Sequence, residues 1–64
     1  MKITVNGNSH NTQANNLEDL LIELQYKGKI ATALNENFVP FNERKNTMLK
    51  YGDRVEIVAP MEGG

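Results

Sequence analysis

Apolar and polar residues alternate near both ends of the chain, and this period of two predicts half-buried β-strands. The first strand is expected at residues 1–5 and the last at residues 54–58. In the last strand Val55 and Ile57 share one face and Val58 lies on the other, because side chains alternate along a strand. We therefore expect Val55 and Ile57 in the core and Val58 on the surface.

A helical period of apolar positions lies between these strands. Leucines recur at the spacing of one helical stripe, at Leu17, Leu20, Leu21 and Leu24. Asn16 is a good N-cap, and Gly28 can adopt the left-handed conformation that often ends a helix. The pattern predicts one helix over about residues 17–27, with its leucines packed across the sheet.

The other segments are typical of short strands joined by turns. Asn6-Gly7 favours a type I′ hairpin turn, followed by a polar edge strand at residues 8–12. Further strands are expected at residues 30–34, 38–39 and 47–49, and residues 41–46 are expected to be irregular or to form one helical turn. One helix and a mixed sheet of four to five strands form two layers, which is the α+β class.

The length of the chain, 64 residues, allows one small domain. A domain of this size buries only about 60% of the surface of its unfolded chain, so an enclosed enzyme pocket is not expected. A small protein that docks onto larger enzymes fits this length better. We expect the domain at residues 1–58 and a flexible C-terminal tail at residues 59–64, because Pro60 discourages extension of the sheet into the tail.

The composition excludes several classes of function. The chain has no cysteine, which excludes a disulfide framework, a thiolate metal site and a thiol nucleophile. Seven basic and eight acidic side chains are interspersed, whereas nucleic-acid binding usually needs a basic face. No segment resembles a signal peptide or a membrane span, so the sequence predicts a cytoplasmic protein that binds neither nucleic acid nor membrane.

The charged side chains near the helix are expected to have structural roles. The acidic residues Glu18, Asp19 and Glu23 are expected to form a solvated helix face, and Lys27 and Lys29 to complement the helix dipole. His10, the single histidine, lies in the polar edge strand and is expected to be exposed and without a catalytic role.

Three sequence motifs, in this order of elements, resemble a known family. They are Ala33-Leu34-Asn35 followed by Val39-Pro40, residues 52–58 beginning with Gly52-Asp53, and the terminal Gly63-Gly64. Together they resemble the ThiS family, the sulfur carriers of thiamine thiazole synthesis, over the whole chain. The resemblance implies a ubiquitin-like β-grasp fold, in which the first and last strands are parallel neighbours at the centre of the sheet.

The resemblance also implies a role for the C-terminal carboxylate. A ThiF-type adenylyltransferase would use ATP and Mg²⁺ to form an acyl-adenylate at Gly64. A sulfur donor such as a cysteine desulfurase would then supply sulfur for a thiocarboxylate, which a ThiG-type thiazole synthase would consume. Gly63 would help the tail to thread a narrow channel, because glycine has no Cβ. The chain itself would be no enzyme and would hold no catalytic residue, metal site or cofactor.

Apolar residues beside the tail predict a docking surface. Val58, Pro60 and Met61 are expected to be apolar and exposed near Gly64. An exposed apolar cluster on a small domain often marks a partner interface, although single apolar side chains are common on protein surfaces. We interpret these three residues as a contact for the activating enzyme.

Two alternative functions remain at this point. One is a sulfur carrier for another acceptor, such as the molybdopterin pathway, whose carriers usually run longer. The other is a β-grasp interaction module without covalent chemistry, against which the free Gly-Gly end argues. Two residues depart from the family pattern: Glu62 replaces a small residue before the final glycines, and Phe41 stands where a polar residue is expected.

Overall fold

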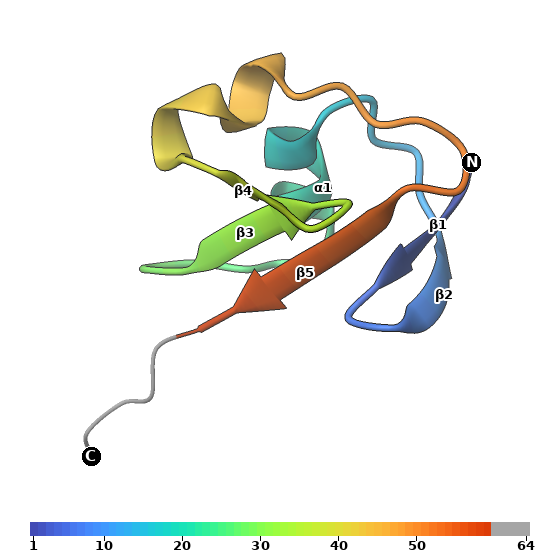
Figure 1. Ribbon diagram of the computed structural model, residues 1–64, viewed down its shortest axis with the longest axis horizontal. Helices are drawn as coiled ribbons and strands as arrows, with labels where there is room; N and C mark the ends of the chain where they lie inside the picture. The colour runs from blue at the N-terminus through green and yellow to red at the C-terminus, as the bar shows by residue number, and fades with distance from the viewer. Residues whose placement is uncertain (60–64) are drawn as a thin grey trace.

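Residues 1–59 form a five-stranded mixed sheet with one α-helix across one face (Figure 1). A computed structural model describes residues 1–59. The elements are β1 (Lys2–Val5), β2 (Asn8–Asn11), α1 (Leu17–Glu23), β3 (Ala31–Leu34), β4 (Asn37–Val39), the 3₁₀ helix η1 (Phe41–Asn46) and β5 (Arg54–Val58). The strand order is β2-β1-β5-β3-β4, with β1 parallel to β5 and the other pairs antiparallel. This confirms the predicted β-grasp fold, with the first and last strands as parallel neighbours.

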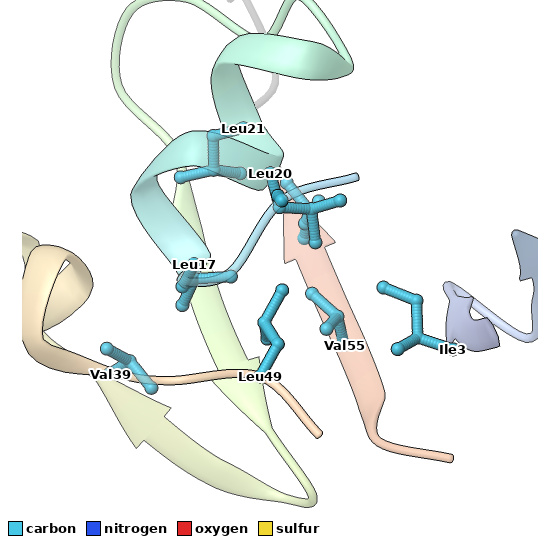
Figure 2. Close-up of a cluster of buried hydrophobic side chains, with 9 residues drawn as sticks. Ile3, Leu17, Leu20, Leu21, Val39, Leu49 and Val55 are labelled. Carbon is cyan, nitrogen blue, oxygen red and sulfur yellow. The ribbon is translucent and has the colours of Figure 1, made fainter. Parts of the chain in front are cut away.

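The core lies between α1 and the inner face of the sheet (Figure 2). Leu17 and Leu20 of α1 are fully buried, at 0% exposure. They face Ile3 of β1 and Val55 of β5, each 1% exposed. The predicted leucine stripe is therefore confirmed for its first turns, whereas Leu24 is only partly buried.

Both ends of α1 are fixed by hydrogen bonds, but the helix is shorter than predicted. At the start, the Asp19 amide donates to Asn16 Oδ1 over 2.8 Å, which confirms Asn16 as N-cap. At the end, Gln25 takes a left-handed conformation with φ of 65° and donates to Ile22 O, while the Tyr26 amide donates to Leu21 O. These two bonds form a Schellman motif, which ends the helix at Glu23, well before Gly28. The prediction of a helix to residue 27, with Lys27 and Lys29 at its end, was wrong.

Two tight turns have left-handed residues at both central positions. Asn6 and Gly7 have φ of 50° and 84°, which confirms the predicted hairpin turn between β1 and β2. Asn35 and Glu36 have φ of 50° and 73° and join β3 to β4 in the same way. Type I′ turns match the twist of the strands that they connect, so each hairpin has a defined register.

The chain between β4 and β5 is more helical than the sequence predicts. Residues 41–46 form the six-residue helix η1, which packs beside α1 (Figure 1). The strand predicted at residues 47–49 is reduced to a single bridge between Asn16 and Met48. Leu49 nonetheless joins the core at 7% exposure, because its amide bonds to Asn15 O and holds this segment against the start of α1.

Glu23 is exposed, as predicted for a solvated helix face, but its carboxylate also fastens α1 to β2 and to the chain that follows β2. Its carboxylate accepts hydrogen bonds from His10 Nε2 at 2.8 Å, Thr12 Oγ1 at 3.0 Å and the Gln13 amide at 3.1 Å. His10 is therefore paired, with about a third of its side chain exposed. These hydrogen bonds, the one from His10 first, lower the pKa of the Glu23 carboxyl below its ordinary value of 4.5, against the opposing effect of partial burial.

The leucine stripe generates a prediction on stability. Leu20→Ala should lower the free energy of unfolding by about 2–5 kcal/mol, because it leaves a cavity at a fully buried position. Ile22→Ala, on the exposed side of the same helix, should cost less than about 1 kcal/mol. Urea unfolding followed by circular dichroism measures both. Equal losses in the two variants would contradict the assignment of the buried helix face.

The carboxylate of Glu23 generates a prediction on pH. A group whose pKa is lowered by folding stabilises the protein above its unfolded pKa, and this contribution is lost as the pH falls through the folded pKa. Glu23→Gln should therefore lower the free energy of unfolding by about 1 kcal/mol at pH 7. The loss is small because the His10 and Glu23 side chains are both partly exposed and water can replace the lost hydrogen bonds. The difference from the unmodified protein should shrink as the pH falls below 4.5. Glu56→Gln, at an exposed strand position, is the control; a Glu23→Gln loss that does not change with pH would contradict the argument.

Candidate functional site

The C-terminal end of β5 is the part of the described chain that leads to the Gly-Gly terminus. Along this strand Val55 and Ile57 are buried, whereas Val58 is 64% exposed. The predicted alternation of faces is thus confirmed. Val58 lies on the outer face of the sheet, away from α1, at the last residue of the strand.

Val58 belongs to a larger apolar surface, which we call the outer patch and define as Ala31, Ala33, Phe38 and Val58. Ala31 pairs with Val58 across β3 and β5, and Ala33 pairs with Phe38 across β3 and β4. Phe38 is 69% exposed. A shallow hollow of about 360 Å³ adjoins this patch and is lined by Lys29, Ile30, Ala31 and Val58.

Phe38 was missing from the docking surface predicted from sequence. Phe38 and Val39 are adjacent apolar residues in one strand, so one of the two must face outward. The structure buries Val39 at 7% exposure, opposite Thr32, and leaves Phe38 outside. Their order relative to Pro40 does not indicate which face is buried, and for this reason the sequence alone did not single out Phe38.

The side chain of Asn6 anchors β5 next to the outer patch. Beyond Val5 the β1 backbone turns away, but Asn6 Nδ2 donates to Ile57 O at 3.2 Å and Asn6 Oδ1 accepts from the Ile57 amide at 2.8 Å. The side-chain amide of Asn6 therefore pairs with the backbone of Ile57, as the next residue of β1 would if that strand continued. Together with the β3 ladder on the other edge, it fixes the position of the backbone immediately before Val58.

The start of β5 is fixed by a second amide side chain. Asn35 Oδ1 accepts from the Arg54 amide at 2.8 Å, and Asn35 Nδ2 donates to Asp53 Oδ1 at 3.0 Å. Asp53 Oδ2 in turn accepts from the Lys50 amide, closing the turn that contains Gly52. Gly52 needs its left-handed φ of 85° to make this turn.

Charge on the outer face is concentrated at the start of β5. Arg54 Nη2 lies 3.7 Å from Glu36 Oε2, and both side chains are more than half exposed. Glu56 is exposed between this pair and Val58. The outer face therefore changes from charged to apolar along β5, toward the C-terminus.

The other predicted site residues lie outside the described part of the chain. Pro60, Met61, Gly63 and Gly64 follow Ala59, so their predicted roles remain predictions. Within residues 1–59, no helix has the length and apolar character needed to cross a membrane.

Comparison with known proteins identifies the family. The model of the ThiS family matches residues 3–64. The chain belongs to the ThiS family. No curated protein matches it significantly. Among solved structures, it is similar to the thiamine biosynthesis protein ThiS from Geobacter metallireducens, with 29% identity over 100% of both chains and a TM-score of 0.84.

The ThiS-family motifs have a physical explanation in this structure. Asn35 and Gly52-Asp53 lie far apart in sequence, yet their hydrogen bonds meet at the first residue of β5. Val39-Pro40 ends β4 and starts the turn into η1. These motifs therefore position the strand that leads to Gly64.

Proposed function

We propose that this ThiS-family protein is a cytoplasmic sulfur carrier of thiamine biosynthesis, and that the carboxylate of Gly64 carries the sulfur. The protein acts as a co-substrate of partner enzymes and holds no catalytic residue of its own. The observation that carries the proposal is the family match over residues 3–64, which includes both terminal glycines. The match in fold and length to a ThiS protein supports it.

The chemistry requires activation, because a carboxylate is a poor electrophile. In the proposed first step, an oxygen of the Gly64 carboxylate attacks the α-phosphorus of ATP on a ThiF-type adenylyltransferase, with Mg²⁺ bound there, and pyrophosphate leaves. A persulfide sulfur, supplied by a donor such as a cysteine desulfurase, then attacks the acyl carbon and AMP leaves. This leaves an acyl disulfide between Gly64 and the donor's cysteine. A thiol then attacks that cysteine's sulfur, forms a disulfide with it and releases the thiocarboxylate, which delivers its sulfur to a ThiG-type thiazole synthase.

The fold contributes position rather than reactivity. Hydrogen bonds on both edges hold β5 to its end, so the tail starts from a fixed point beside the outer patch. We propose that the outer patch, together with Pro60 and Met61, docks on the adenylyltransferase while Gly63 and Gly64 enter its active site. Full burial of a side chain of the size of Val or Phe contributes about 1.5–3 kcal/mol.

The role of Gly64 can be tested by intact mass. After incubation with a ThiF-type adenylyltransferase, ATP, Mg²⁺ and a sulfur donor, the full chain should gain the mass difference between one sulfur and one oxygen atom. The same chain without Gly64 should gain no mass. Its thermal unfolding should be unchanged, because the deleted residue follows the last strand.

Each other outcome selects a different function. A full mass gain in the chain without Gly64 would contradict the proposed site of sulfur. No mass gain in the full chain would favour a β-grasp module without covalent chemistry. If the thiocarboxylate forms but supports no thiazole synthesis, a sulfur carrier for another acceptor is favoured.

The docking role of Val58 can be separated from stability. Val58→Asp should leave thermal unfolding near normal, because the side chain is exposed and the outer face already includes Glu56. The KM of the adenylyltransferase for this variant should rise at least tenfold, because the substitution places an unpaired charge in a contact that excludes water. A factor of ten corresponds to about 1.4 kcal/mol of binding free energy. Val55→Asp, on the buried face of the same strand, should unfold the domain. Pyrophosphate release and circular dichroism measure the two effects.

A normal KM for Val58→Asp would exclude the outer patch from the adenylation interface. It would leave the role of Gly64 unaffected, because that role is measured by the mass gain.

A further inference from the structure

A second surface feature lies on the helix side of the sheet, between α1, the segment after it and η1. It is a groove of about 240 Å³ that we call the basic groove, lined by Leu21, Ile22, Tyr26, Lys27, Phe41 and Arg44, among others. Ile22 is 67% exposed and Phe41 is 77% exposed. The outer patch lies on the opposite face of the sheet, so the roles proposed above do not account for this groove.

Arg44 is the unusual residue of the groove, because it is a charged residue with a relative exposure of only 7%. Its Nε donates to Thr32 Oγ1 at 3.3 Å, and its Nη2 donates to Ile30 O at 2.7 Å. Its guanidinium carbon lies 5.3 Å from the centre of the Phe41 ring. These contacts hold the fork of the guanidinium in one orientation.

The positive charge of Arg44 has no counter-charge in residues 1–59. No carboxylate there forms an ion pair with it, and Glu18, which also lines the groove, is not bonded to it. Within residues 1–59, Arg44 Nη1 forms no hydrogen bond, and since no unpartnered side-chain nitrogen there is fully buried, Nη1 retains some exposure. Arg44 is among the residues that line the groove. A largely buried cation without an anion is costly, and a carboxylate in the groove would offset that cost.

The surroundings of Arg44 define what fits the groove. Lys27 adds a second cation to the lining, and Lys45 lies beside Phe41 at its edge. Ile22 and Phe41 offer apolar surface next to these charges. Exposed apolar side chains around a charged centre are typical of protein interfaces rather than of enclosed sites for small anions.

We propose that the basic groove docks a segment of a partner protein in which a carboxylate side chain is flanked by apolar or aromatic residues. The carboxylate accepts hydrogen bonds from Arg44 and pairs with Lys27, and the apolar neighbours lie on Ile22 and Phe41. The inference does not depend on the sulfur-carrier function. It makes the protein a module with docking surfaces on both sides of its sheet.

The experiment is a titration of the full chain, labelled with nitrogen-15, with the peptide acetyl-Leu-Asp-Phe-amide. Amide shifts should change in a saturable manner around residues 22–28 and 41–45. The peptide with Asn in place of Asp should bind at least fivefold more weakly, because it lacks the charge. Saturation without this difference would overturn the proposed role of Arg44.

Matched variants distinguish the groove from general surface effects. Ile22→Asp and Lys27→Glu change exposed side chains of the groove and should weaken binding of the Asp peptide at least fivefold. Lys2→Glu and Tyr51→Asp make the same kinds of change at exposed positions outside it and should leave binding unchanged. Arg44→Gln should remove most of the preference for Asp over Asn, because it removes the positive charge. If that variant does not fold, the proposal is still tested by comparing Lys27→Glu with Lys2→Glu and Ile22→Asp with Tyr51→Asp.

Other occupants of the groove would give different results. If the chain ending at Ala59 binds the peptide tenfold more tightly than the full chain, the protein's own tail occupies the groove and the proposal is wrong. It is also wrong if the full chain dimerises and Ile22→Asp abolishes the dimer. Absence of saturable binding, or shift changes confined to the outer patch, would equally overturn it.

Discussion

Hydrogen bonding of β5 along both edges is the constraint on which the rest of the structure depends. The strand lies between β1 and β3, and side-chain amides continue the pairing where a backbone partner is missing. Because both edges are occupied, β5 cannot shift its register without breaking both ladders, and a shift of one residue would expose Val55 and Ile57. The same constraint fixes Val58 on the outer face at the point where the chain continues toward Gly64.

The small size of the domain explains why its functional features lie on its surface. Within residues 1–59, the short helix α1 covers one face of the sheet with η1 beside it, and nine buried apolar residues form the core. A domain of this size has a thin core, which fits the proposal that the terminal carboxylate is activated on a larger partner. Among the described residues, the outer face exposes Phe38 and Val58, the side chains that we propose contact such a partner.

Sequence pattern predicted those features that depend on local periodicity or on one residue's conformational preference. The alternation in β5, the leucine stripe of α1, the Asn16 cap and the Asn6-Gly7 turn are of this kind. The end of α1 was missed because a Schellman motif formed at Gln25, a residue with no special preference for φ > 0. The bonds of Glu23 and the amide contacts of Asn6 join residues distant in sequence, and periodicity carries no information about them.

Arg44 was not singled out from the sequence, yet it both holds η1 to the sheet and lines the groove for which we propose a binding role. Thr32 is 1% exposed; its hydroxyl donates to Val39 O and accepts from Arg44 Nε, so this buried pair links β3, β4 and η1. The contacts that tie η1 to the sheet also fix the orientation of the guanidinium of Arg44, which lines the basic groove. Since that orientation is already fixed by the fold, a partner's carboxylate need not order a long flexible side chain, and less conformational entropy is lost on binding than with an exposed lysine. The sheet separates this groove from the outer patch, so a partner bound in the groove leaves the outer patch accessible.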